Sequence, residues 1–395
     1  MKVYLKNAYL INENKTATIL LENDVAKVVD EIDSNDSMVL DLENRIVIRG
    51  FADVHTHLDK ALITSRIANK SGTLKEAIEI MGPYKRNMTQ EDIEERMRQV
   101  VDMCYSHGTR FLRTNLDIDD IIGLKSLDVF KKIRSEWDGK LVLESVAFPQ
   151  EGFVSNMANF SWLEDAILSG ADAIGGIPAN EVDPKKHIYS LFKLAIKYDK
   201  DLDMHIDEND NPNSNTLEIL ADAVEKFNFK RKVIAAHCCS LASKDPSEVE
   251  RVLNKVKKNN VNIVSLPSTN LYLQGRDDNK CVRRGIAPVK KICEKDINVC
   301  IASDNIRDPF NCFGNGNPLE AALIAAHGCQ LGGEQDLNNL FDMITKNGIE
   351  LMNEDYHINN SKFLVILDAK TPAEAIIEQR GIFATYEKGE FKKNN

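Results

Sequence analysis

The fold is decided by residues 46–59, which read IVIRGFADVHTHLD, an apolar run that ends in two histidines separated by one residue. Apolar runs without polar alternation are typical of strands buried on both faces of a parallel sheet. Because side chains alternate along a strand, His55 and His57 point to the same side. Two imidazoles so placed can share one metal ion, although a single His-x-His pattern also occurs by chance or as a buried polar pair.

Similar apolar runs, each of about 5 to 8 residues, alternate with amphipathic segments along the central part of the chain. Most of them begin about 30 residues after the previous one, as a strand, a loop and a helix require. We expect strands near residues 47–55, 109–117, 140–148, 171–177, 201–206, 232–237, 261–266 and 297–303. Eight such units predict an α/β fold built as a (β/α)8 TIM barrel with its helices outside.

The two ends of the chain have a different pattern, in which short alternating apolar segments are separated by Asn and Asp. This pattern favours strands and turns before residue 48, and strand-like runs return at residues 363–367 and 381–385. We therefore expect a small β-sandwich domain formed by the N- and C-terminal segments, residues 1–48 plus 359–395. Residues 49–358 would form the barrel.

Composition narrows the class of partner. The chain has 395 residues and a formal net charge of -11, with no strongly basic run that could gather the phosphate contacts of a nucleic acid. No apolar run reaches the roughly eighteen residues that span a bilayer. The 8 cysteines form no C-x-x-C pair and are typical of reduced core thiols. We expect a cytoplasmic protein that acts on a small molecule, without nucleic acid or membrane partners.

Candidate metal ligands follow several predicted strands. His205 and His237 lie at the ends of the fifth and sixth strands, as His55 and His57 do for the first, and Asp304 follows the eighth. Barrel enzymes build their active sites at these carboxyl ends of strands. A buried carboxylate is costly unless it meets a cation or donors. His55, His57, His205 and Asp304 therefore predict a site for one divalent metal ion, Zn²⁺ or Fe²⁺, with a position left for a hydrolytic water.

Glu208 lies three residues beyond His205, where the chain leaves the strand. From there it could reach the pocket without being a ligand and serve as general acid or base. Taken singly, Glu208 and its neighbour Asp207 have the residue type of exposed loop carboxylates. The four histidines outside these strand ends are assigned no chemistry.

Four motifs together resemble bacterial cytosine deaminase of the amidohydrolase superfamily. They are GFADVHTHLD at 50–59, AFPQEG at 147–152, HIDE at 205–208 and LQGR at 273–276. The resemblance implies a mononuclear centre with the four ligands above. It also implies that His237 lies beside the attacking water, that Asp304 and His237 take its proton, that Glu208 shuttles a proton to the ring, and that Gln150 reads the ring's amide edge.

The sequence departs from that family at two positions, where Asn115 replaces a histidine and Asn305 replaces an aspartate. Residues 302–308 and Lys60 resemble instead N-isopropylammelide amidohydrolase, which acts on substituted triazines. Phe310 stands where cytosine deaminase has a larger aromatic side chain. The two resemblances imply that Gln150, Asn305, Lys60 and Phe310 contact the substrate, and that Asn305 sets which ring edge is preferred.

The expected function is hydrolytic deamination of a free cyclic amidine or nucleobase, with cytosine converted to uracil and ammonia as the leading reaction. Other heterocycles remain open: creatinine, methylcytosine, isoguanine and a substituted aminotriazine such as N-isopropylammelide. A barrel that has lost catalysis and serves as a scaffold is a further alternative, but all four ligand positions and the acid/base residue are present. The relatives suggest a homo-oligomer.

Overall fold

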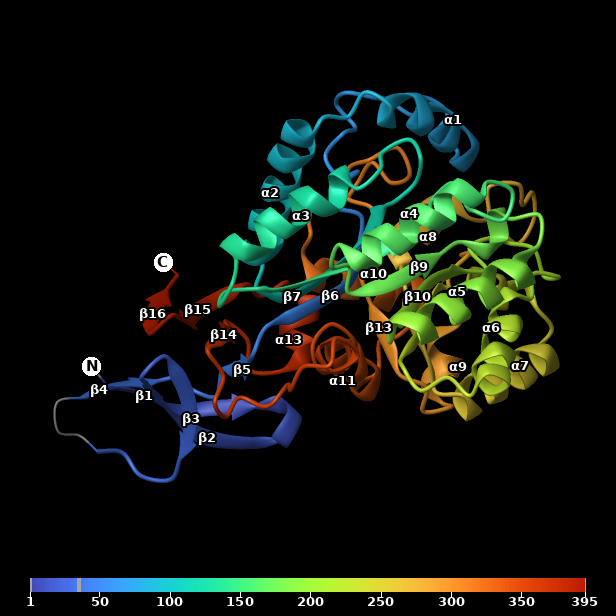
Figure 1. Ribbon diagram of the computed structural model, residues 1–395. Coiled ribbons are helices and arrows are strands. Elements are labelled where there is room, and N and C mark those ends of the chain that lie inside the picture. The colour runs from blue at the N-terminus through green and yellow to red at the C-terminus, as the bar shows by residue number, and fades with distance from the viewer. Residues whose placement is uncertain (1, 34–36, 395) are drawn as a thin grey trace.

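The computed structural model describes residues 2–33 and 37–394 and contains two sheets, one of which is parallel (Figure 1). In the parallel sheet each strand pairs with the next one along the chain. Its strands are β6 Phe51–Thr56, β7 Thr109–Asp117, β8 Val142–Phe148, β9 Ala173–Gly176, β10 Asp201–Ile206, β11 Val233–His237, β12 Val261–Ser265 and β13 Val299–Ile301. The predicted barrel is thereby confirmed.

The barrel closes between its first and last strands through residues of the candidate site. The backbone N–H of Asp304 donates to the carbonyl of His55 at 2.8 Å, and Thr56 and Asp304 form a parallel bridge. Closure therefore places the carboxylate that follows the eighth strand beside the histidines that end the first.

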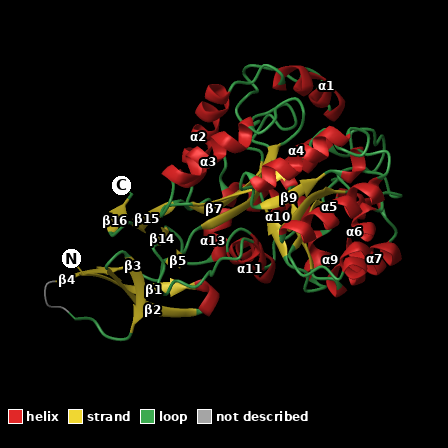
Figure 2. Cartoon of the chain, viewed as in Figure 1, coloured by secondary structure: helices red, strands yellow, loops and turns green. Residues whose placement is uncertain are grey.

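Helices surround the barrel (Figure 2). They are α1 Leu74–Lys85, α2 Gln90–Ser106, α3 Lys125–Glu136, α4 Met157–Leu168, α5 Pro184–Tyr198, α6 Thr216–Phe227, α7 Pro246–Lys258, α8 Pro267–Leu273, α9 Val289–Cys293, α10 Pro318–Cys329, α11 Glu334–Met343 and α12 Lys346–Leu351, with short 3-10 helices at Pro178–Asn180 and Cys239–Ser243. Helix α2 begins where the Thr89 hydroxyl accepts the Asp92 N–H at 3.2 Å, which satisfies one free donor of the first turn.

The second sheet joins the two ends of the chain, as predicted. Strand β14 pairs antiparallel with β5, with Val365 opposite Ile48. The sheet contains β1 Lys2–Leu10, β2 Lys15–Glu22, β3 Val25–Val29, β4 Ser37–Asp41, β5 Ile46–Ile48, β14 Phe363–Leu367, β15 Ile382–Glu387 and β16 Glu390–Lys393, accompanied by a 3-10 helix at Ile11–Glu13 and by α13 Pro372–Ile377. The domain boundaries near residues 48 and 359 stay a prediction.

One expectation about the decisive stretch is wrong. The apolar run at 47–55 is two strands, because β5 belongs to the mixed sheet and β6 to the barrel. Gly50, between them, has φ +152°, and a Cβ at this position would lie 2.5 Å from the side chain of Arg110. Only glycine allows this conformation and this close approach. The chain therefore changes sheet here without an intervening helix.

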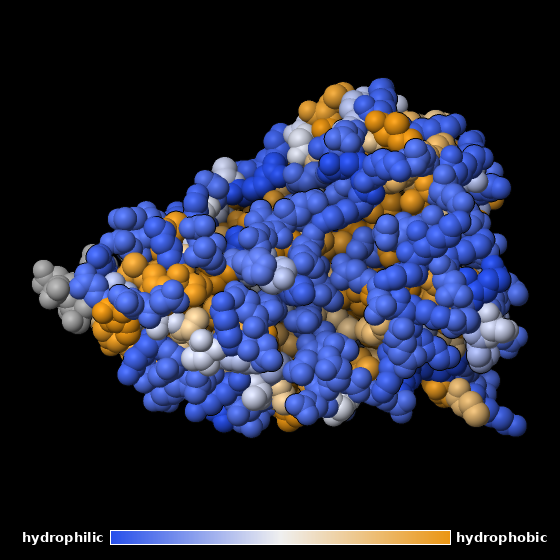
Figure 3. Space-filling view, turned by 90° about the horizontal axis from the view of Figure 1, so that it is seen from below, coloured by the Kyte–Doolittle hydropathy of each residue, from blue (hydrophilic) through white to orange (hydrophobic). Residues whose placement is uncertain are grey.

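The face seen from below is mainly hydrophilic, with scattered hydrophobic patches (Figure 3). Over residues 2–33 and 37–394, no helix combines the length and the apolarity that crossing a bilayer demands.

Candidate metal centre and active site

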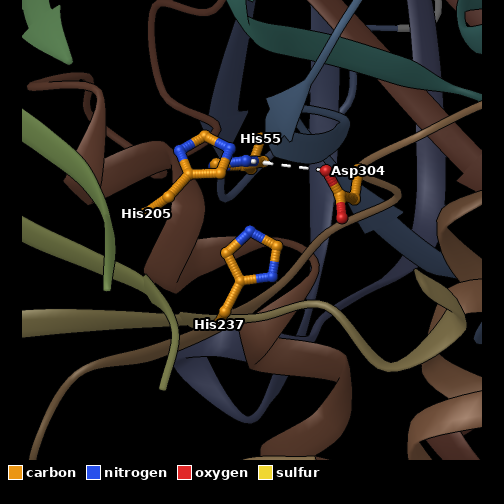
Figure 4. Close-up of side chains that lie close together, drawn as sticks. All are labelled: His55, His205, His237 and Asp304. Carbon is orange, nitrogen blue, oxygen red and sulfur yellow. Dashed lines mark ion pairs between the residues drawn. The ribbon is translucent and has the colours of Figure 1, made fainter. Parts of the chain in front are cut away.

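Three histidines and one aspartate converge at the mouth of the barrel (Figure 4). His55 lies in β6, His205 lies in β10, His237 ends β11, and Asp304 follows β13. Each offers one ligand atom, these atoms lie within 4.8 Å of one another, and all four residues are buried. Strands far apart in the sequence thus bring together one group of potential metal ligands.

The second histidine of the decisive stretch adjoins the same group. His57 Nε2 lies 3.2 Å from His205 Nε2 and 3.3 Å from Asp304 Oδ1. The corresponding distance from His55 Nε2 to Asp304 Oδ1 is 3.7 Å. All the residues predicted to hold a metal therefore meet, together with His237, in what we call the histidine–Asp304 cluster.

The cluster has the chemistry of a site built for a cation. Within the described ranges, neither carboxylate oxygen of Asp304 has a hydrogen-bond partner, and the same is true of His57 Nδ1 and His237 Nε2. Burial lowers the pKa of His55 and of His237 to about 3, so both imidazoles are neutral near pH 7. Neutral imidazole and carboxylate are ligands of Zn²⁺ and Fe²⁺, and a bound cation removes the cost of an unpaired buried carboxylate. The residues present fit a divalent metal ion.

The orientation of His237 depends on a residue that the sequence did not single out. The Asn270 amide nitrogen, on α8, lies 3.0 Å from His237 Nδ1. With Nδ1 occupied, Nε2 is the ring nitrogen that faces the cavity, where Glu208 Oε2 lies 3.6 Å away. No spacing rule connects Asn270 with His237, because their contact is made only by the folded chain.

A second unpredicted group supports His55 from inside the barrel. Asp203 Oδ1 lies 4.0 Å from His55 Nδ1. Arg113 donates to Asp203 Oδ2 at 3.3 Å and to Glu144 Oε2 at 2.6 Å. Asp203 stands two residues before His205 in β10, so the period-two rule that paired His55 with His57 would also have placed Asp203 inside the barrel.

Neither Asp207 nor Glu208 is the exposed loop carboxylate that its residue type alone suggests. Asp207 is buried, has φ +49°, and accepts hydrogen bonds from Ser214 Oγ and Thr216 N, which ties it to the start of α6. The turn at Asp207 brings Glu208 to the cavity wall, with its side chain 16% exposed. Burial, assisted by the charge of Asp304, raises the pKa of Glu208 well above its usual value. Burial therefore favours the protonated form of the Glu208 carboxyl group.

A cavity of about 60 Å³ lies over the histidine–Asp304 cluster. Its wall includes the four residues predicted to contact substrate, Lys60, Gln150, Asn305 and Phe310. Asn115 is absent from the wall and lies behind it, with its amide nitrogen 3.4 Å from His55 Nδ1. The departure at Asn115 therefore bears on a candidate ligand rather than on the substrate pocket.

Apolar residues that the sequence did not single out complete the cavity. Leu74 and Ile78 reach it from α1, and Ile177 and Ala179 from the loop after β9. Helix α1 lies in the long segment between the first two barrel strands, where sequence alone does not indicate which apolar side chains face the barrel mouth.

The amide of Asn305 is engaged from behind. Its Nδ2 donates to Asp308 Oδ2 at 2.7 Å, while Asp308 Oδ1 accepts from the backbone N–H of Phe310 at 2.8 Å. Burial raises the pKa of Asp308 to about 7. Asp308 thus links two residues of the cavity wall and fixes the direction of the Asn305 amide.

The chain is similar to several proteins of known kind. The sequence profile of the Amidohydrolase family matches residues 159–359. The crystal structure of 5-methylcytosine deaminase from Klebsiella pneumoniae, liganded with phosphonocytosine, is 30% identical, with a TM-score of 0.93 over 100% of this chain and 98% of that chain. N-isopropylammelide isopropyl amidohydrolase from Pseudomonas sp. is 27% identical over 95% of this chain and 93% of that protein.

Pterin deaminase from Rhizobium rhizogenes is 33% identical over 71% of this chain, and the match spans 64% of that protein's length. The family match covers half of the chain, and the likeness to the Klebsiella structure covers nearly all of both chains. This chain belongs to the amidohydrolase family and is a hydrolase that acts on C–N bonds.

Proposed function

We propose that this chain hydrolytically deaminates a free, single-ring amino-heterocycle, with cytosine and 5-methylcytosine as the leading substrates. The observation that carries the proposal is the unpartnered carboxylate of Asp304, surrounded by four buried histidines beneath a small cavity. The likeness to 5-methylcytosine deaminase supports a pyrimidine. We assign His55, His57, His205 and Asp304 as the ligands of one Zn²⁺ or Fe²⁺ ion.

The size of the cavity favours one ring without a sugar. A cavity of about 60 Å³ is far smaller than the roughly 300–1,000 Å³ of pockets that hold drug-sized ligands.

The residues of the site divide the proton transfers between them. A divalent ion, when bound, supplies a Lewis acid that lowers the pKa of a water molecule. Asp304 takes a proton from the water that attacks the amino-bearing ring carbon, and His237, whose Nδ1 accepts from the Asn270 amide and whose Nε2 therefore carries the ring hydrogen, lies beside that water. Glu208, protonated through its raised pKa, gives its proton to the adjacent ring nitrogen and makes that carbon electrophilic. The proton held by Asp304 then passes to the amino group, ammonia leaves, and the remaining hydroxyl proton of the attacking water returns to Glu208.

A substituted aminotriazine is the second candidate. Lys60 and Asn305, which match the N-isopropylammelide branch, both line the cavity. The apolar side chains of Leu74, Ile78 and Phe310 on the same wall suit an alkyl substituent. The identity of 27% with N-isopropylammelide isopropyl amidohydrolase extends over 95% of this chain.

The test is a substrate panel on metal-loaded protein. Release of ammonia or alkylamine is measured for cytosine, 5-methylcytosine, isoguanine, creatinine, N-isopropylammelide and pterin, with metal content determined on the same sample. We expect one metal per chain and the highest kcat/KM on a one-ring aminopyrimidine. A protein with one bound metal that releases amine from none of these compounds would overturn the proposal. Light scattering on the same sample tests the expected homo-oligomer.

A further inference from the structure

The cavity wall formed by Lys60 and Gln150 has an unusual hydrogen-bonding character. Lys60 is 1% exposed, and its ammonium donates to Asp117 Oδ1 at 2.6 Å and to Gln150 Oε1 at 3.0 Å. Both Lys60 and Gln150 line the cavity, whereas Asp117 lies behind it. A buried cation thus forms part of a binding wall.

Further charges hold the ammonium of Lys60 in place. Lys85 donates to Asp117 Oδ2 at 3.0 Å and to Asp119 Oδ2 at 2.6 Å. We call Lys60, Lys85, Asp117 and Asp119 the lysine–carboxylate cluster. All four are at most 1% exposed. Burial alone would lower the pKa of Lys60, but the carboxylate of Asp117 outweighs it and the pKa is raised. Lys60 therefore stays charged without a ligand.

The contact with Lys60 also determines what Gln150 offers to a ligand. Because Oε1 faces the ammonium, the amide group Nε2 is the free end of the side chain, and a side-chain NH2 only donates. No acceptor for Nε2 is found in residues 2–33 and 37–394. An ammonium has three N–H donors, and in the same ranges Lys60 uses two of them. This wall therefore presents donors only, one of them cationic.

We propose that Lys60 is a specificity-determining residue that binds an oxo group or ring oxyanion of the substrate together with Gln150, and that Asp117 and Lys85 are its positioning residues. The inference rests on the proposed function and narrows its substrate class. Asp304, whose carboxylate oxygens accept hydrogen bonds, and Glu208, which carries the proton for the ring nitrogen, line the same cavity and suit the amino-bearing part of the ring. A heterocycle with an amino group in place of the oxo group would bring donors against donors at Lys60.

Binding of two matched compounds tests this without turnover. Uracil carries a 2-oxo group and an adjacent ring N–H that 4-pyrimidinone lacks, and the Kd values of both compounds are measured by calorimetry on metal-loaded protein, with the Lys60 variant separating the part due to the oxo group. We expect uracil to bind about 10- to 100-fold more tightly, the range for a charge-assisted hydrogen bond. Lys60→Met should remove most of that preference. Equal Kd values in the wild-type protein, or no binding of either compound, overturn the inference.

Turnover provides the second readout. The quantity compared is kcat/KM for cytosine divided by kcat/KM for 4-aminopyrimidine, which lacks the oxo group. Lys60→Met should reduce this ratio about 10- to 100-fold, mainly by raising KM for cytosine. Asp117→Asn should act in the same direction to a smaller extent, because the Lys60 ammonium keeps its hydrogen bond to Gln150. Lys232→Met is the matched control, since Lys232 bonds the backbone of Leu351 away from the cavity, and it should leave both ratios unchanged.

The two proposals fail in different ways. If no heterocycle is deaminated but uracil still binds through Lys60, the proposed function fails and the oxo site stands. If cytosine is deaminated and Lys60→Met leaves the substrate ratio unchanged, the oxo site fails alone. If Lys60→Met does not fold, Gln150→Leu takes its place, because Gln150 is only partly buried. Loss of the preference for uracil in Gln150→Leu supports the oxo site, and an unchanged preference overturns it.

Discussion

Two buried polar clusters at the mouth of the barrel differ in how their atoms are satisfied. In the histidine–Asp304 cluster, both oxygens of Asp304 lack partners within the described part of the chain. In the lysine–carboxylate cluster, Lys85 sits between Asp117 and Asp119, and Lys60 pairs with Asp117. A buried polar group without a partner is costly, whereas a paired one is tolerated. The first cluster requires a cation from outside the chain, whereas the charges of the second are paired within it.

A third buried group also has paired charges, although Asp203 Oδ1 has no hydrogen-bond partner among the described residues and the group adjoins the histidine–Asp304 cluster. Arg113 pairs with Glu144 and Asp203, and Asp203 approaches His55 at 4.0 Å. Complete pairs on two sides of the site keep its side chains in fixed positions before any ligand arrives. Pre-organisation of this kind is what a catalytic site needs from its surroundings.

Removal of the metal should have the largest effect, because it returns the histidine–Asp304 cluster to its unsatisfied state. After dialysis against a chelator we expect no measurable turnover and a lower Tm, since a ligand present at 1,000 times its Kd stabilises the native state by about 4 kcal/mol. Turnover, metal content and Tm are measured before and after re-addition of Zn²⁺ or Fe²⁺. An unchanged Tm and full activity in metal-free protein would contradict the assignment of the cluster.

Glu208→Gln should affect chemistry while leaving the cluster intact. Its side chain faces His237 at 3.6 Å and is not among the proposed ligands. We expect metal content and Tm to stay as in the wild type while kcat falls by about 10² to 10⁴, the range for loss of general acid/base catalysis. Near-normal turnover would remove Glu208 from the mechanism, and loss of metal would make it a ligand.

The alternation of side chains along a strand, together with the position of the apolar runs, explains why candidate ligands could be identified from the sequence. It placed His55 and His57 on one side of β6, and the apolar runs before His205, His237 and Asp304 identified the other strand ends. Parallel strands that close into a barrel must bring those ends together, so the convergence follows from topology.

The parts that were missed depend on tertiary contacts. The decisive stretch contributes to two sheets because Gly50 approaches Arg110 more closely than a Cβ allows, and the position of Arg110 is not visible in the local sequence. Asn270 meets His237 only across the fold. The burial of Asp207 depends on Thr216, nine residues later, which could have suggested a capping contact but did not require one.

Arg113→Met should show how much the buried ion pairs of Arg113 contribute to the free energy of unfolding, independently of the bound metal ion. It leaves Glu144 and Asp203 without their shared cation, and breaking a buried pair typically costs about 3–5 kcal/mol. Denaturant unfolding measures the loss. The control is Arg98→Met, because Arg98 is 33% exposed and pairs with Glu94 at the surface, where about 0–1 kcal/mol is expected. Similar losses in the two variants would show that the buried pairs contribute no more than surface pairs.

Asn305→Asp should have the smallest effect and concerns the link between the cavity wall and Asp308. The substitution introduces the carboxylate that the resemblance to cytosine deaminase implies at this position, and a mismatched buried polar contact costs about 1–3 kcal/mol. We therefore expect kcat/KM for cytosine, relative to the best other substrate, to rise about 5- to 150-fold. An unchanged ratio would show that Asn305 does not read the substrate.

The gain in Asn305→Asp should depend on pH, because the new carboxylate would lie where the Asn305 amide now donates to Asp308 at 2.7 Å. Burial raises the pKa of Asp308 to about 7, which is above the pKa of an aspartate in the unfolded chain. The contribution of Asp308 to the free energy of unfolding of the wild type therefore falls as the pH rises from about 4 to 7, and it stays constant above pH 7. Two adjacent buried carboxyl groups share one proton more readily than they both ionise.

In the Asn305→Asp variant the free energy of unfolding should continue to fall as the pH rises above 7. The ratio of kcat/KM for cytosine to that for the best other substrate should rise more at pH 6 than at pH 8. Unfolding free energies and both kcat/KM values at these two pH values test this. A variant whose stability is level above pH 7 would show that residue 305 and Asp308 do not share a proton.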